Sequence, residues 1–158
     1  MRQYIARLLP WLLLAPAVLP LVYINGMLYP FVAPKTLLFR ALGIVVLAAF
    51  FYLAFSGREL YWGRLRNKLS WIPAALLVVA YAMSLLGVDF YHSFWSVYDR
   101  GDGLLTLTTA VVFFYSTLLF VDRNFLPRLF KVVAWVATAV SAYVVLQWLG
   151  EISGINFS

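Results

Sequence analysis

Residues 36–55 read TLLFRALGIVVLAAFFYLAF and contain a single charged side chain, that of Arg40. A helix that crosses the hydrocarbon core of a bilayer needs about 20 predominantly apolar residues. Pro34 and Lys35 precede the run, and proline is favoured in the first turn of a helix. The stretch therefore predicts a membrane-spanning helix over residues 36–55.

Further apolar runs of similar length lie on both sides of this one. They cover residues 8–24, 71–87, 104–121 and 130–149. We expect the last of them to stop at Gly150, because glycine commonly follows the last residue of a helix. The sequence thus predicts an all-α polytopic membrane protein, with about five transmembrane helices that form a single domain over residues 1–158.

The composition agrees with this fold class. The chain has 158 residues, of which 65% are hydrophobic and 11% are charged. Soluble domains carry about 25% charged residues, so a water-soluble globule is excluded. The sequence contains no cysteine, which excludes a disulfide scaffold and thiolate metal sites. The net charge of +6 comes from cations that lie between apolar runs, so we expect membrane lipids as partners and no nucleic acid.

The run over residues 8–24 is unusual because it contains Pro10, Pro16 and Pro20. Proline removes a helical hydrogen bond, so we expect a kinked or irregular helix. The small residues around Pro16 loosely resemble a signal-peptide cleavage site. The apolar run continues past that point, however, and this favours an uncleaved anchor helix over a cleaved leader.

The positive charges predict the orientation. Short cytoplasmic loops are enriched in Lys and Arg. With the N-terminus in the cytoplasm, the inner segments hold nine cations and the outer segments hold two. The nine are Arg2, Arg7, Arg58, Arg64, Arg66, Lys68, Arg123, Arg128 and Lys131, and the two are Lys35 and Arg100. The sequence therefore predicts a cytoplasmic N-terminus and a periplasmic C-terminus.

Arg40 is the first candidate site residue. An arginine within a membrane span costs about 2.5–3.5 kcal/mol at the bilayer centre and is a functional hypothesis by default. Its guanidinium suits bidentate binding of a phosphate, and Lys35 lies nearby in the sequence to add a second charge. The alternatives are that Arg40 snorkels to the interface or caps backbone carbonyls that the prolines of the first helix leave free.

The second candidate is the outer segment over residues 87–103. Its aromatic residues, Trp95 among them, suit an interfacial half-helix or a sugar-stacking surface. Asp89, Asp99 and Asp102 are candidates for a base or for binding a divalent cation. The interpretation we favour is a local ion pair between an aspartate and Arg100, with a turn around Gly101. His92 is interpreted as a hydrogen-bonded surface residue. The sequence shows no metal-ligand spacing and no catalytic triad order, so we assign no catalytic residue, metal or cofactor.

The order of these features resembles the N-terminal part of the bacterial O-antigen ligase and O-antigen polymerase family. The matching pieces are YPFVAPKTLLFR at residues 29–40, GVDFYHSFW at 87–95, YDR at 98–100, GLLT at 103–106 and LQWLG at 146–150. Together they extend over essentially the whole chain. The resemblance implies transfer or polymerisation of a glycan carried on a polyprenyl diphosphate, at the outer face of the bacterial inner membrane.

The resemblance also implies that catalysis belongs elsewhere. In the family, the essential Arg and His residues lie in or beside a large periplasmic loop downstream of the helices found here, and no position of this chain matches them. We therefore expect a fragment or a shortened relative that does not catalyse alone, and whose partners are the rest of the enzyme or other envelope-assembly proteins. The alternatives are a non-catalytic membrane scaffold and a part of a small-solute transporter.

Overall fold

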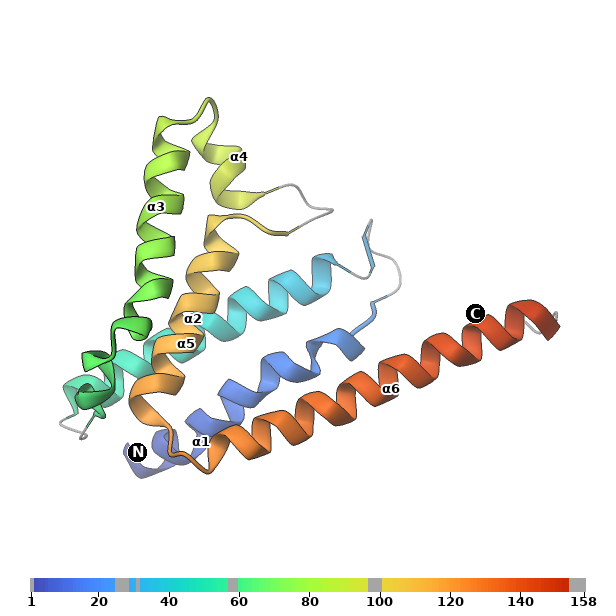
Figure 1. The fold of residues 1–158 in the computed structure, drawn as a ribbon, viewed down its shortest axis with the longest axis horizontal. Coiled ribbons are helices and arrows are strands. Elements are labelled where there is room, and N and C mark those ends of the chain that lie inside the picture. Colours follow the sequence, from blue (N-terminus) through green and yellow to red (C-terminus); the bar gives the residue numbers. More distant parts are fainter. Residues whose placement is uncertain (1, 25–28, 31, 57–59, 97–100, 154–158) are drawn as a thin grey trace.

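The computed structural model of the protein describes residues 2–24, 29–30, 32–56, 60–96 and 101–153. Within these residues every regular element is a helix (Figure 1). In chain order they are α1 (Arg2–Leu14), the 3-10 helix η1 (Ala15–Leu21), α2 (Ala33–Phe55), the 3-10 helices η2 (Trp62–Arg66) and η3 (Lys68–Trp71), α3 (Ile72–Leu86), α4 (Phe90–Trp95), α5 (Leu104–Phe120) and α6 (Phe125–Ser153).

The structure confirms the all-helical membrane class. Among the described residues, four helical segments are long and apolar enough to cross a membrane, namely Gln3–Leu21, Ala33–Phe55, Lys68–Leu86 and Phe125–Leu149. The fifth predicted span corresponds to α5, which is apolar but has 17 residues. At 1.5 Å per residue α5 is about 25 Å long, slightly shorter than a hydrocarbon core of about 30 Å.

The first predicted helix starts earlier than expected and changes type within the run. α1 begins at Arg2 and tolerates Pro10, and the chain then tightens into the 3-10 helix η1 from Ala15. The α conformation is disfavoured for a residue that directly precedes a proline, and Ala15 directly precedes Pro16. The predicted irregular helix is therefore present, with its break at Ala15.

The last helix departs from the prediction at both ends. α6 begins at Phe125 instead of residue 130, and Pro127 lies in its first turn. The helix also continues through Gly150 to Ser153, so the prediction that Gly150 stops it was wrong. Glycine costs about 1 kcal/mol inside a helix, and neighbouring residues can outweigh a cost of that size.

α2 and α5 form the most extensive helix pair, and α3 lies beside α5 (Figure 1). The rings of Phe39 on α2 and Phe113 on α5 stack with centroids 5.2 Å apart. A buried apolar cluster joins α1, α2, α5 and the start of α6. It contains Leu9, Leu13, Leu14, Val46, Ala49, Leu53, Leu119, Phe120, Val121 and Phe125. This cluster fixes the helices at the end of the molecule that holds the N-terminus.

η2 lies against the C-terminal end of α5. The Nη1 group of Arg64 donates to the carbonyl oxygens of Leu118 and Val121, at 2.7 and 2.6 Å. The guanidinium also stacks over the ring of Tyr61, and the Tyr61 hydroxyl donates to Asp122. Carbonyls in the last turn of a helix lack helical partners, so Arg64 supplies the donors that this end of α5 requires.

Candidate functional site

A cavity of about 380 Å³ lies between the first half of α2 and the short helix α4. Its walls come from α2, α4 and the connection from α4 to α5. The lining residues are Ala33, Thr36, Leu37, Arg40, Tyr91, His92, Trp95, Ser96 and Gly101. Among the lining residues that the structure describes, Arg40 is the one whose side chain carries a charge at every physiological pH.

Arg40 holds three elements together. Its Nε group donates to Oγ1 of Thr106 on α5, and its Nη2 group donates to the carbonyl oxygen of Trp95, both at 3.0 Å. Trp95 is the last residue of α4, so the cation lies at the carbonyl end of that helix. A guanidinium has five N–H groups, and these two bonds use two of them. Arg40 therefore has three further donors for a ligand in the cavity.

The connection that closes the cavity requires glycine. Gly101 has a φ of +67°, a backbone conformation that residues other than glycine rarely adopt. A β-carbon on Gly101 would also overlap the hydroxyl group of Thr36 on α2. The Gly101 carbonyl accepts from Oγ1 of Thr106 at 2.7 Å, and the same hydroxyl accepts from Arg40. The turn, α5 and the arginine are thus linked by one hydroxyl group.

Asp89 starts α4 as its N-cap residue. Its carboxylate accepts from the backbone N–H of His92 at 3.0 Å and lies 2.8 Å from Nδ1 of the same residue. The pKa of Asp89 is lowered below its usual value, mainly by the hydrogen bond from the backbone N–H of His92 and next by the hydrogen bond with the His92 ring. His92 is hydrogen-bonded and largely exposed at the side of the cavity.

Aromatic rings form the α4 side of the cavity. Tyr91 and Trp95 are both partly exposed, and their ring centroids are 6.4 Å apart. Phe94 packs edge-on against Trp95 at 5.3 Å. The arrangement places a cation beside rings that have open faces, which is a combination suited to a ligand that contains both phosphate and sugar.

Three of the residues singled out in the sequence line this cavity, Arg40, His92 and Trp95, and Asp89 is the N-cap of the helix that carries the last two. Lys35 is half-buried and is not one of the lining residues. Asp99 and Arg100 lie outside the described residues. Arg40 does bind a backbone carbonyl, as one alternative held, but this carbonyl belongs to α4 and not to the first helix.

Sequence reasoning missed Thr106 as a part of the site, and although Tyr91 and Gly101 lie in the candidate segment at residues 87–103, it did not single them out as ligand-facing residues. Thr106 gave no signal because it lies within an apolar run, and Tyr91 is one of many aromatic residues near the predicted helix ends. Gly101 carried a usable signal, because it belongs to the Gly-Asp-Gly sequence that breaks the chain before residue 104.

The part of the chain that the structure describes has no group of three or more His, Cys, Asp or Glu residues placed to hold a metal ion. Comparison of the chain with family profiles, with curated proteins and with solved structures finds no match.

Proposed function

We propose that the chain is the membrane-embedded portion of a polyprenyl-diphosphate-linked glycan ligase or polymerase of the bacterial inner membrane. In this proposal its task is to hold the diphosphate of the lipid-linked substrate, while the catalytic residues belong to another segment or subunit. The observation that carries the proposal is the half-buried guanidinium of Arg40, which faces a 380 Å³ cavity with three N–H groups beyond those bound to Trp95 and Thr106.

The position of the cavity supports a lipid-linked ligand. Arg40 lies two turns from the start of α2, a helix long enough to span the membrane. A headgroup held there keeps its hydrocarbon chain in the bilayer while its sugar extends toward Tyr91 and Trp95. Charge-assisted bonds from a guanidinium to phosphate oxygens are among the stronger hydrogen bonds in proteins.

The proposal includes the finer topology. We propose α5 as a fifth span. The helices η2 and α4 lie at opposite ends of α3. α5 begins next to α4, and its last turn is bound to η2, so α5 extends from one end of α3 to the other. With five spans and basic segments on the cytoplasmic side, the cavity opens toward the periplasm, and the N- and C-termini lie on opposite sides.

A scaffold is the second candidate, and one observation favours it. Both hydrogen bonds of Arg40 tie α4 and α5 to α2, so the arginine also has a structural use. The transporter alternative requires polar groups at a broken helix. The break in the first span has the sequence APAVLPL, which supplies none.

Binding of a polyprenyl diphosphate to the purified chain in lipid nanodiscs tests the proposal. We expect Arg40→Ala to weaken binding by about tenfold or more, which corresponds to the loss of at least one charge-assisted bond. Arg40→Lys keeps the positive charge but loses the bidentate geometry of the guanidinium, so it should weaken binding partially. Lys35→Ala should have the smallest effect, because Lys35 does not line the cavity.

Thr106→Val is the matched control. It breaks the Nε bond of Arg40 and the link to Gly101 but keeps the guanidinium. We expect it to lower stability while affinity stays within about threefold of the wild type, a change below 1 kcal/mol. Equal losses of affinity in Thr106→Val and Arg40→Ala, or unchanged affinity in Arg40→Ala, would favour the scaffold.

A further inference from the structure

A second cavity lies at the opposite end of α5 from Arg40. It has a volume of about 320 Å³ and is bordered by η2, the last turns of α5 and the first turn of α6. The charged residues of its described lining are Arg64, Asp122 and Arg123, and its apolar walls include Phe114, Leu118 and Leu126. The cavity therefore combines two cations with an apolar groove and is separate from the site that contains Arg40.

Arg64 is held in place by hydrogen bonds that use only some of its N–H groups. Its bonds to the carbonyls of Leu118 and Val121 both come from Nη1, so they do not use the Nε and Nη2 hydrogens. The Tyr61 ring, 4.1 Å from the guanidinium carbon, covers one face of the group. A guanidinium fixed on two sides loses little conformational freedom when its other edge binds a ligand.

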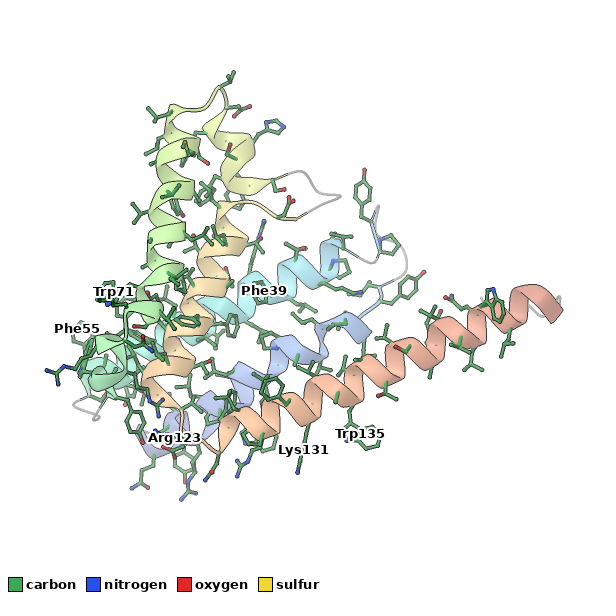
Figure 2. The ribbon with its side chains drawn as sticks, in the orientation of Figure 1. Phe39, Phe55, Trp71, Arg123, Lys131 and Trp135 are labelled. Atoms are coloured by element: carbon green, nitrogen blue, oxygen red, sulfur yellow. The ribbon has the colours of Figure 1, made fainter. Side chains whose placement is uncertain are left out.

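The charge balance of the cavity favours an anion. Arg64 and Arg123 contribute two positive charges, and Asp122 contributes one negative charge that accepts a hydrogen bond from Tyr61. Arg128 and Lys131 follow on the first two turns of α6 and add to the positive field at this end. Figure 2 shows Arg123 and Lys131 near the start of α6. Basic pockets between membrane helices bind the headgroups of anionic lipids.

The apolar walls distinguish a lipid from a soluble anion. Phe114 and Leu118 come from α5, and Leu126 comes from α6 and is about half exposed. These side chains form the apolar part of the lining, where α5 and α6 diverge from the turn between them (Figure 1). A free phosphate would use the arginines alone, whereas a phospholipid would also place an acyl chain against this groove.

We propose that this cavity binds an anionic phospholipid, with its phosphate at Arg64 and Arg123 and an acyl chain in the groove between α5 and α6. The lipid would join η2, α5 and α6 and so stabilise the turn at residues 121–124. This inference is independent of the polyprenyl diphosphate proposal, because the two cavities share no residue.

Thermal unfolding of the purified chain in detergent, with added phosphatidylglycerol or phosphatidylcholine, tests the site. A ligand that binds the folded state raises the unfolding temperature. We expect a larger rise with phosphatidylglycerol, and native mass spectrometry should show one tightly retained phosphatidylglycerol. Equal rises with both lipids, or an equal rise with inorganic phosphate, would overturn the proposal.

A matched pair of variants separates the site from general attraction. Arg123 and Arg128 are both exposed, and of the two only Arg123 lines the cavity. Arg123→Gln and Arg128→Gln lower the net charge equally. We expect Arg123→Gln to reduce phosphatidylglycerol affinity by about threefold to tenfold, and Arg128→Gln to leave it within twofold, because one exposed charge-assisted bond is worth about 1 kcal/mol. Equal losses in the two variants would overturn the proposal.

A third variant should change affinity in the opposite direction. Asp122→Asn removes the negative charge from the cavity and keeps an oxygen that accepts from the Tyr61 hydroxyl. The proposal therefore expects tighter binding of phosphatidylglycerol in Asp122→Asn than in the wild type. Weaker binding in that variant, with unchanged stability in the absence of lipid, would contradict an anionic ligand.

Discussion

Gly43 of α2 lies directly against Thr109 of α5: a β-carbon on Gly43 would overlap Cγ2 of Thr109. The Thr109 side chain cannot rotate freely, because it is β-branched and its hydroxyl donates to the carbonyl of Leu105 at 2.8 Å. Small residues at helix contacts in membranes allow the backbones to approach in this way. The crossing that positions Arg40 beside α4 thus depends on a glycine one turn further along the same helix.

Gly43→Ala should therefore lower the free energy of unfolding by about 1–3 kcal/mol, the usual cost of overpacking. Gly63→Ala is the control, because no atom lies within 4 Å of a β-carbon at that position. Combining Gly43→Ala with Thr109→Ser, which removes Cγ2, should recover part of the loss. Equal stability of Gly43→Ala and the wild type in detergent would show that the helices do not pack this closely.

Arg64→Ala should destabilise the protein by about 2–4 kcal/mol, because two carbonyl groups at the end of α5 lose charged donors. Arg66→Ala removes the same charge from an exposed position of the same short helix and should change stability by less than about 0.5 kcal/mol. Thermal unfolding of both variants in one detergent gives the comparison. Equal effects would mean that Arg64 acts only through its charge.

The lowered pKa of Asp89 gives α4 a defined pH dependence. A carboxyl group whose pKa is lower in the folded state stabilises that state above its unfolded pKa, near 3.9, and this contribution is lost as the pH falls through the folded value. We expect the Trp95 signal in fluorine NMR of fluorotryptophan-labelled protein to shift or broaden below about pH 4. Asp89→Asn should remove this transition, and a transition that persists in that variant would assign it to another group.

Cysteine labelling in this cysteine-free chain tests the proposed topology. The topology places residues 56–70 and 122–131 in the cytoplasm, and residues 88–103 and the C-terminal tail in the periplasm. A membrane-impermeant reagent applied to spheroplasts should label Val88→Cys, whose side chain is fully exposed. It should not label Lys68→Cys or Arg128→Cys. Labelling of Arg128→Cys together with Val88→Cys would show that α5 does not cross the membrane.

Part of the candidate site was predictable because it depends on local rules. A charged residue within an apolar run is conspicuous, and this rule identified Arg40. A short helix was one of two interpretations of the aromatic residues in the outer segment, and the structure has α4 at Phe90–Trp95. The partners of Arg40 were not predictable, since Thr106 and Trp95 lie 66 and 55 residues away in the sequence.

The amino-acid sequence by itself determined the helical membrane class and the approximate position of each long helix. Long runs of apolar residues place these segments in the lipid bilayer. Every backbone N–H and C=O group there needs a hydrogen-bond partner within the protein, and a helix supplies these partners within one segment. The sequence did not determine which carbonyls the arginines bind, because those hydrogen bonds join segments that are distant in the chain. The close approach at Gly43 brings α2 to α5, and only that crossing gives Arg40 its two partners and leaves a cavity beside it.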